Sequence, residues 1–225
     1  MKESGGRHEL KHYINYGDLL QIRSRLKCVA RHDENAADGC VYRVRSLYFD
    51  NYNDKVLREK IDGVDEREKF RLRLYNNDSS FIRLEKKTKK NGLCYKKSAL
   101  ITKEECKRLL EGDAGVLKEN GNQLLLDLYV KMCFQQLRPK NIVDYMREAY
   151  VFPAGNVRIT LDYDIRTGSD VNSFLETEIN TVSIPKVFIL EVKYDKFLPE
   201  LMRGIVSLSS RQSAAFSKYA AARII

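Results

Sequence analysis

The sequence predicts an α+β fold in which long antiparallel strands and helices are segregated along the chain. Alternating apolar and polar side chains indicate the strands, and apolar side chains three and four positions apart indicate the helices. No repeat, low-complexity segment or linker rich in Pro, Gly and Ser interrupts the 225 residues. We therefore expect a single domain over residues 1–225.

The first half of the chain begins with an alternating strand and ends with three strands that follow one another closely. In order, the elements are a strand at 7–14, a helix at 18–30, a β-rich segment at 40–50, a short helix at 53–60, and strands at 67–75, 80–89 and 93–100. Asp18 lies near the start of the first helix, where acidic residues are common. Asn76-Asn77-Asp78 and Asn91-Gly92 have the composition of hairpin turns, so hairpins should join the last three strands.

The second half alternates between helices and strands. A helix begins at Thr102, because Glu105 three residues later completes a capping-box pattern. Pro153 and Gly155 separate two of the later strands. The remaining elements are a helix at 123–136, strands at 142–152, 157–165 and 187–194, and closing helices at 199–208 and 213–223.

One face of the strand at 67–75 carries four cations, whereas the other face is mainly apolar. Because strand side chains alternate, the cationic face consists of Arg67, Lys69, Arg71 and Arg73, and the other face of Glu68, Phe70, Leu72 and Leu74. Antiparallel sheets often keep one face in water, so a solvated charged face is one interpretation. However, like charges on neighbouring strands are destabilising, and a bound polyanion would remove that penalty.

The same alternation places acids beside lysines on three other strands. The lysine follows the acid by two positions in each pair, so the two side chains share a face; the pairs are Glu9 and Lys11, Glu85 and Lys87, and Glu191 and Lys193. Carboxylates bind hard divalent cations, and such cations bind phosphate oxygens. The three glutamates are therefore candidate metal ligands, and the lysines beside them are candidate phosphate ligands.

The charge balance indicates an anionic partner. The net charge is +9 and the isoelectric point is about 9.2, which is typical of proteins that bind nucleic acids, membrane surfaces or phosphorylated molecules, although an ordinary basic protein has the same composition. The five cysteines lack CxxC spacing, which argues against a zinc site or a disulfide framework and favours the reducing cytoplasm. No apolar run reaches 18 residues and no P-loop or GxGxxG motif occurs, so neither a membrane span nor a Gly-rich nucleotide site is expected.

Eight segments of the sequence resemble, in the same order, the polyphosphate polymerase domain of the VTC type, which belongs to the triphosphate tunnel metalloenzyme (CYTH-like) superfamily. The resemblance extends from about residue 7 to residue 220. The segments are RHELKHYI, YRVRSLYFDN, REKFRLRLY, FIRLEKKTKK, YMREAY, VRITLDYDIR, ILEVKYD and FSKY.

The resemblance implies an eight-stranded antiparallel tunnel with helices outside and phosphate-binding Lys and Arg side chains inside. Matched motif by motif, the tunnel cations would be Lys11, Lys60, Arg71, Arg73, Lys87, Arg147, Arg158 and Lys218. Lys97 or Lys96 would occupy another basic position, and Glu191 would bind Mn²⁺ or Mg²⁺. Ala215 stands where the closing helix of the family usually has a second lysine. The implied reaction transfers the terminal phosphate of ATP, or of another triphosphate, onto a growing polyphosphate chain.

Other interpretations remain open at the level of sequence. Arg147 could pair with Glu148 or Asp144 at a sheet edge, and Lys218 could be a solvated helix charge. The same scaffold could hydrolyse inorganic triphosphate, or could bind polyphosphate or inositol phosphates without turnover. A nucleic-acid partner is not expected, because the cations lie opposite apolar residues in long strands and no RRM or OB motif is present.

Overall fold

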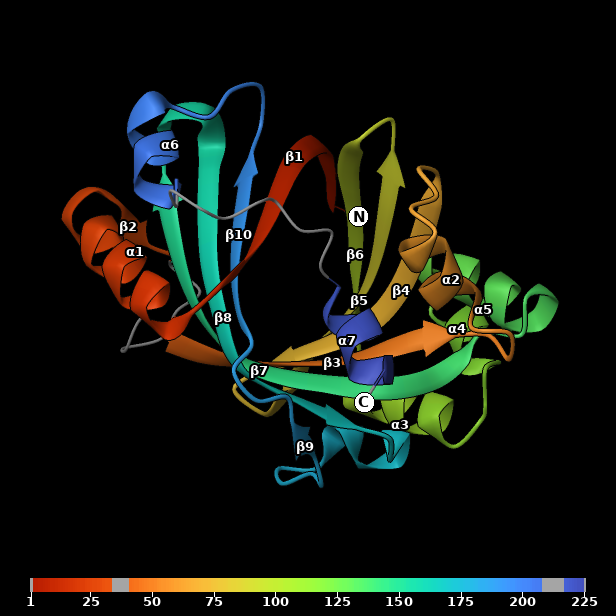
Figure 1. Ribbon diagram of the computed structural model, residues 1–225. Coiled ribbons are helices and arrows are strands. Elements are labelled where there is room, and N and C mark those ends of the chain that lie inside the picture. The colour runs from red at the N-terminus through yellow and green to blue at the C-terminus, as the bar shows by residue number, and fades with distance from the viewer. Residues whose placement is uncertain (1, 34–40, 208–216, 225) are drawn as a thin grey trace.

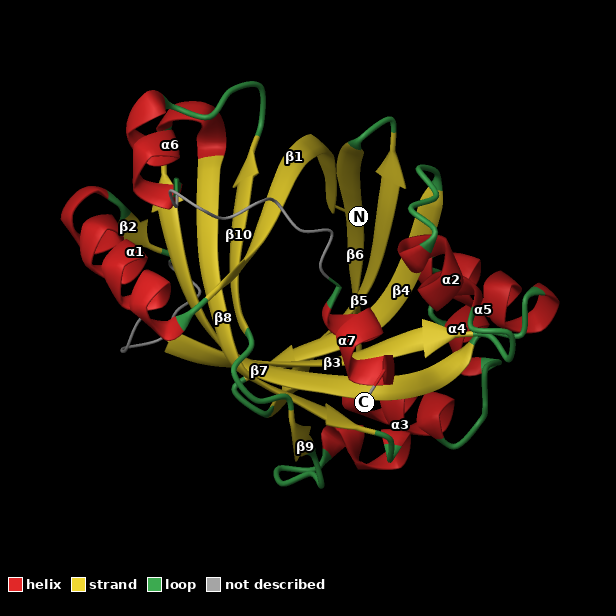
Figure 2. Cartoon of the chain, viewed as in Figure 1, coloured by secondary structure: helices red, strands yellow, loops and turns green. Residues whose placement is uncertain are grey.

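Eight antiparallel strands close into a barrel in the computed structural model, which describes residues 2–33, 41–207 and 217–224. The predicted α+β barrel is therefore confirmed (Figures 1 and 2). The barrel strands are β1 (Lys2–Ile14), β3 (Val41–Asp50), β4 (Arg67–Tyr75), β5 (Asp78–Lys90), β6 (Leu93–Ile101), β7 (Arg138–Phe152), β8 (Val157–Gly168) and β10 (Phe188–Tyr194).

The barrel closes because its two terminal strands pair with each other. The strands follow the order β7-β3-β4-β5-β6-β1-β10-β8, and β8 pairs with β7 to complete the ring. Two short strands, β2 (Arg31–His32) and β9 (Val182–Ser183), add to β7 and β8. Closure leaves each barrel strand hydrogen-bonded on both sides, and it separates an inner face from an outer face.

Helices pack around the barrel, most of them over its outer face. They are α1 (Tyr16–Val29), α2 (Lys55–Ile61), α3 (Lys103–Leu110), α4 (Val116–Glu119), α5 (Gln123–Phe134), α6 (Glu200–Val206) and α7 (Lys218–Ile224), with 3-10 turns at Ala154–Asn156 and Val171–Leu175. The capping box predicted at Thr102 and Glu105 is present. Helix α1 begins at Tyr16, two residues before the predicted start, because Asn15 caps it in a second capping box with Asp18.

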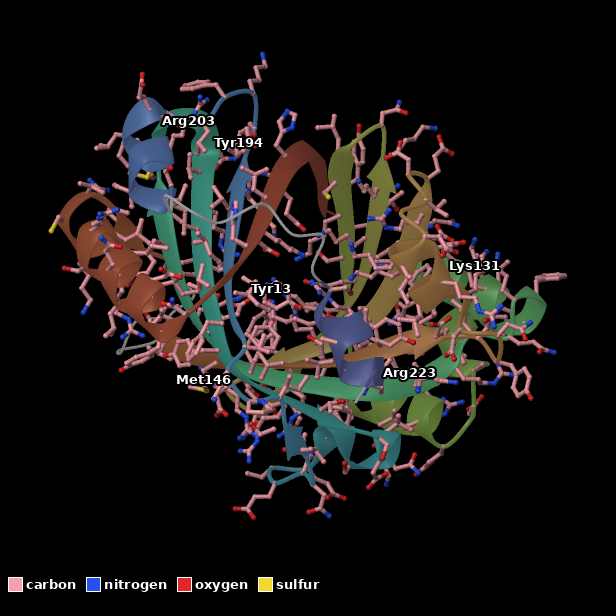
Figure 3. The ribbon with its side chains drawn as sticks, viewed as in Figure 1. Tyr13, Lys131, Met146, Tyr194, Arg203 and Arg223 are labelled. Atoms are coloured by element: carbon pink, nitrogen blue, oxygen red, sulfur yellow. The ribbon has the colours of Figure 1, made fainter. Side chains whose placement is uncertain are left out.

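The apolar core lies between the outer face of the barrel and the helices. Phe70 and Leu72 of β4 belong to a cluster with buried leucines of α3, α4 and α5, whereas α1 and α6 cover Ile159 and Leu161 of β8. Each such side chain contributes about 1.5–3 kcal/mol when it leaves water. Because this outer packing stabilises the wall, the inner face can remain polar. Figure 3 shows the labelled Lys131 on α5, outside the wall, where it pairs with Glu68.

Several predicted boundaries differ from the structure. The predicted strands at 7–14 and 142–152 begin earlier, at Lys2 and at Arg138. Pro139 lacks an N–H group and is unusual inside a sheet, but a register shift opposite Tyr48 and Phe49 accommodates it. The helix predicted at 123–136 ends at Phe134. Of the helix predicted at 213–223, residues 213–216 lie outside the described residues, as do Cys40 and the end of the helix predicted at 199–208.

The two predicted hairpin turns are confirmed. Asn76 and Asn77, between β4 and β5, both have positive φ angles, of 51° and 59°. Asn91 and Gly92, between β5 and β6, have φ angles of 52° and 74°. Asn and Gly tolerate this left-handed conformation, which two-residue hairpin loops of this kind require. Among the described residues, no helix is long and apolar enough to cross a membrane.

Candidate functional site

The inner face of the barrel encloses a basic cavity of about 500 Å³. Twelve Lys and Arg residues line it, against four Asp and Glu residues, so much of the excess charge of the protein converges on one enclosed space. Eleven of the residues predicted for the site are among those that line it: Glu9, Lys11, Arg71, Arg73, Glu85, Lys87, Arg147, Arg158, Glu191, Lys193 and Lys218.

A second basic cavity, of about 340 Å³, adjoins the first. The predicted Lys60, from α2, lines this second cavity. Along β4 the inner side chains Arg73 and Arg71 line the first cavity, Lys69 lines both, and Arg67 lines the second. Lys87 and Lys89 of β5 follow the same order. The two cavities are therefore successive parts of one passage along β4 and β5, which we call the tunnel.

Three arginines in the first cavity are held in fixed orientations by hydrogen bonds. The Arg71 guanidinium bonds Glu85 at 2.7 and 2.8 Å, and the Arg147 guanidinium bonds Asp162 at 2.6 and 2.8 Å. Arg73 donates to Ser46 Oγ at 3.0 Å and to the Tyr145 hydroxyl at 3.2 Å. We call Arg71, Arg73 and Arg147 the arginine group. Fixed, charged donors of this kind stabilise negative charge without reorganising.

The alternatives left open for Arg147 and Lys218 are not what the structure shows. Glu148 instead pairs with Arg23, and Asp144 pairs with Arg43 and Arg45. Lys218 is buried, and its Nζ lies 2.5 Å from the Asp162 carboxylate. Burial raises the pKa of Asp162, but the charges of Arg147 and Lys218 outweigh it and lower the pKa to about 2. A buried carboxylate thus holds one arginine and one lysine at the cavity wall.

Arg158 lies elsewhere on the same wall. Its guanidinium donates to Asp33 at 2.7 Å and to the Tyr42 hydroxyl at 3.0 Å. Asp33 follows the two-residue strand β2, and its backbone N–H bonds the Ala149 carbonyl of β7. This acid was not among the predicted site residues, because nothing in the local sequence pattern connects it with Arg158.

Three lysines and two glutamates form a compact network, which we call the lysine group (Lys11, Lys87, Lys193, Glu9 and Glu191). The Nζ of Lys11 lies 2.9 Å from Glu9 and 3.1 Å from Glu191. Lys87 bonds Glu9 at 2.5 and 2.8 Å, and Lys193 lies 2.7 Å from Glu191. Burial alone would raise the pKa values of both glutamates, but the surrounding lysines hold these pKa values well below the ordinary range. Both carboxylates are therefore charged at neutral pH.

The three glutamates proposed as metal ligands do not form one site. Glu85 bonds Arg71 and Lys96, whereas Glu9 and Glu191 share Lys11. Among the described residues, no three His, Cys, Asp or Glu side chains are grouped closely enough to hold a metal together. Glu9 and Glu191 are nevertheless a charged, buried pair of oxygen donors. Mg²⁺ and similar ions commonly bind one or two carboxylates and take further oxygens from substrate phosphates, so these two residues fit such an ion.

Lys96, and not Lys97, lines the tunnel. In the β5–β6 register, Lys96 lies opposite the inward Lys87, and Lys97 lies opposite Lys86. Lys86 is on the outer face, where it pairs with Glu68 and with Asp127 of α5. Of the two lysines offered by the sequence, Lys97 therefore lies on the outer face, because two adjacent lysines fit the alternation equally well and only the pairing with β5 shows which one faces inward.

This register makes a prediction with a built-in control. We expect Lys96→Ala to weaken the binding of tripolyphosphate about tenfold, because a charge-assisted hydrogen bond is lost. Lys97→Ala, which removes the same charge from the outer face, should change the affinity less than about twofold. Isothermal titration calorimetry at fixed salt measures both. Equal losses in the two variants would contradict the assignment of the inner face.

Two residues that line the tunnel were missed or undervalued by the sequence-based prediction. Tyr48, which the sequence does not single out as a site residue, is buried and accepts a hydrogen bond of 3.3 Å from Arg71. Lys69 lines both cavities, and its Nζ lies 5.4 Å from the centre of the Tyr48 ring. Its place in the cationic row of β4 was the signal that could have identified Lys69. Among the described residues, no carboxylate pairs with it.

The charge of Lys69 is sensitive to pH near neutrality. Burial, together with the charges of Lys87 and Lys11, lowers its pKa to about 7. Burial, Arg67 and Lys11 likewise lower the pKa of Lys60 to about 8. A bound polyanion favours the protonated forms, so binding should take up protons, and these two contributions to affinity should disappear as pH rises through about 7 to 8.

We therefore predict that the wild type loses affinity for tripolyphosphate relative to Lys69→Arg as pH rises from about 6 to about 9. Arginine stays charged throughout this range, so the ratio of the two dissociation constants should change by roughly tenfold. The charge of tripolyphosphate also changes with pH, but this change affects both proteins equally and therefore does not alter the ratio. Titration calorimetry in two buffers with different ionisation enthalpies counts the protons taken up. A ratio independent of pH would contradict the prediction.

The family model of the VTC domain matches residues 6–224. No curated protein sequence matches the chain. A structure from Hippeastrum, described as a candidate adenylyl cyclase with a dominant triphosphatase activity, has a TM-score of 0.55 and 12% identity, and the match covers 98% of this chain and 96% of that chain.

Two bacterial structures also match. A candidate adenylate cyclase from Bacillus halodurans has a TM-score of 0.47 and 12% identity, with 84% of this chain and 82% of that chain covered. Another from Vibrio parahaemolyticus has a TM-score of 0.47 and 11% identity, with 90% and 85% covered. The Hippeastrum structure shows the same fold over almost the full length of both chains.

Proposed function

The chain belongs to the VTC domain family, and we propose that its tunnel binds the phosphates of ATP or another triphosphate and transfers the terminal phosphoryl group onto a polyphosphate chain. One observation carries this proposal: twelve Lys and Arg side chains converge on a single enclosed cavity with only four acids. Such a density of like charge is costly without an anion, and a triphosphate supplies the missing negative charge.

The arginine group is suited to the transferring phosphoryl group. Phosphoryl transfer depends mainly on positioning and on stabilising charge on the phosphate oxygens. Asp162 holds Arg147 by two hydrogen bonds, and Glu85 holds Arg71 by one hydrogen bond and a second close contact of the ion pair, so both guanidinium groups are oriented. The remaining N–H groups can then donate to phosphate oxygens in the cavity. An acceptor phosphate is already ionised, so no general base is required for its attack.

The lysine group is suited to the neighbouring phosphates and to a divalent ion. A Mg²⁺ or Mn²⁺ ion held by Glu9 and Glu191 would neutralise charge on the bound phosphate oxygens. Lys87 and Lys193 would bind phosphates beside these carboxylates as point charges. Lys11, which contacts both glutamates, would give up part of that contact when an ion binds.

The second cavity favours a polymeric acceptor over water. Beyond Lys69 and Lys87 the tunnel continues into a space lined by Lys60, Arg67 and Lys89. An anionic chain in this space would meet cations along its length. Hydrolysis is the second candidate reaction, and it is supported by the dominant triphosphatase activity of the Hippeastrum protein, whose fold is similar.

Incubation of the purified protein with ATP and Mn²⁺ distinguishes these reactions. Long polyphosphate on a gel is the expected product of transfer, whereas free phosphate without polymer indicates hydrolysis. Tight binding of tripolyphosphate in calorimetry with neither product would identify a binding module. The absence of both product and binding would reject the proposal.

A further inference from the structure

Aromatic rings gather at one end of the first cavity. We call this part of the cavity the aromatic end. It is lined by three aromatic residues and by an arginine that contacts one of them: Tyr42, Tyr75, Phe81 and Arg83. The Tyr42 and Tyr75 rings lie 5.9 Å apart, and the Arg83 guanidinium lies 4.6 Å from the centre of the Phe81 ring. Phe81 is 39% exposed although it lies on the inner face of β5, so part of its ring is available to a ligand.

The aromatic end has no counterpart at the other end of the tunnel. Along β5, Phe81 and Arg83 precede the inward Glu85, whereas Lys87 and Lys89 follow it and line the second cavity. Among the described residues that line the second cavity, only Tyr219 is aromatic. The tunnel thus has one end at which aromatic side chains gather and another end at which cations outnumber acids, and an elongated ligand with one aromatic terminus would bind in one direction.

The spacing along β5 suits a nucleotide. Phe81 precedes Glu85 by four residues on the same face, which corresponds to about 13 Å along a strand. Glu85 bonds Arg71 of the arginine group, so the ring and the phosphate-binding centre are separated by a length that an extended nucleoside triphosphate spans. Between them, Arg83 lies directly opposite Arg73 in the β4–β5 register. Two arginines facing each other repel, and a phosphate between them would remove the repulsion.

The side chain of Arg83 is held by stacking and not by an acid. Among the described residues, no carboxylate pairs with Arg83, whereas Arg71 and Arg147 each bond one. A guanidinium stacked on a phenyl ring keeps its N–H donors free at the edge of the plane. Those donors can reach a phosphate while the ring presents its other face to a planar base.

We propose that the aromatic end binds the base of a nucleoside triphosphate, with Phe81 as the stacking platform, so that the donor lies with its base at Phe81 and its terminal phosphate toward the arginine group. This inference rests on the proposed binding of a triphosphate in the tunnel. It deepens that proposal by making a nucleotide, and not inorganic triphosphate, the preferred donor. Stacking recognises any base, so ATP and GTP should bind comparably.

The test compares ATP with tripolyphosphate in Phe81 variants by titration calorimetry at fixed salt and pH. Phe81→Ala should weaken ATP binding about tenfold, which is the usual scale for loss of one base–aromatic stack, and should weaken tripolyphosphate binding clearly less, because only the orientation of the Arg83 donors is then lost. Phe81→Tyr keeps the ring and should retain ATP affinity. Phe134→Ala is the matched control, because Phe134 is 84% exposed at the end of α5, outside the barrel.

Each outcome decides the inference. A selective loss of ATP affinity in Phe81→Ala that Phe81→Tyr restores supports it. Unchanged ATP affinity in Phe81→Ala, or equal losses for ATP and tripolyphosphate, overturns the base site but leaves the phosphate site intact. If the wild type binds neither ligand, the proposed function fails and this inference fails with it. Circular dichroism of every variant shows whether an affinity loss reflects unfolding, and in that case the milder Phe81→Leu decides by the same criterion.

Discussion

Replacing Arg71 with alanine should reduce turnover by about 10²- to 10³-fold, the usual cost of removing one preorganised donor to a developing negative charge. Arg71 is held by Glu85 at 2.7 and 2.8 Å, so its orientation is set before substrate binds. Arg71→Lys keeps the charge but loses the planar pair of donors, and it should recover only part of the activity. Turnover is measured as polymer or phosphate formed at saturating ATP and Mn²⁺.

The fold should survive this substitution. Glu85 keeps Lys96 and Arg73 as cationic neighbours, so its charge stays compensated after Arg71 is removed. Arg43→Ala is the matched control: Arg43 is on the neighbouring strand β3 but pairs with Asp144 on the outer face. Full activity in a cooperatively folding Arg71→Ala protein would remove the arginine group from the mechanism.

Strand alternation predicted most of the inner wall correctly because it depends only on backbone geometry. Once β4 and β5 have an inner face, Arg71, Arg73 and Lys87 must share it, and these residues do line the cavity. The same rule cannot distinguish two adjacent candidates, so the sequence leaves Lys96 and Lys97 as alternatives, and only the β5–β6 register shows that Lys96 faces inward. Local periodicity fixes the two faces of a strand, but only pairing with neighbours shows which face is inside.

The partners of the inner cations could not be predicted from the sequence. Asp162 meets Arg147 only through the β7–β8 register, which shifts between Asp144 and Met146. Asp33 reaches Arg158 across 125 positions of sequence. The low pKa of Lys69 likewise depends on burial and on lysines of other strands. Such properties arise from closure of the barrel, and neither composition nor spacing contains them.

Asp162→Asn should lower the free energy of unfolding by about 3–5 kcal/mol, the usual cost of removing one partner from a buried ion pair. The Asp162 side chain is completely buried, and it compensates both Arg147 and Lys218. Asparagine has nearly the same shape but presents an amide N–H₂ to these donors, so two buried cations lose their counter-charge. Urea unfolding at neutral pH, where the wild-type carboxylate is ionised, measures the difference.

The pH dependence of stability and the effect of a bound anion test the role of the Asp162 charge independently. Because the folded pKa of Asp162 is depressed to about 2, its contribution is present above the unfolded pKa near 3.8 and is lost as pH falls toward 2. The difference in unfolding free energy between the wild type and Asp162→Asn should therefore become smaller on acidification.

Tripolyphosphate should raise the unfolding temperature of the variant more than that of the wild type, since it supplies the negative charge that Arg147 and Lys218 lack in the variant. Asp113→Asn, in an exposed pair with Arg108 that water screens, should cost far less than Asp162→Asn. A comparably small cost for Asp162→Asn would show that the cationic wall is stable without its buried acid.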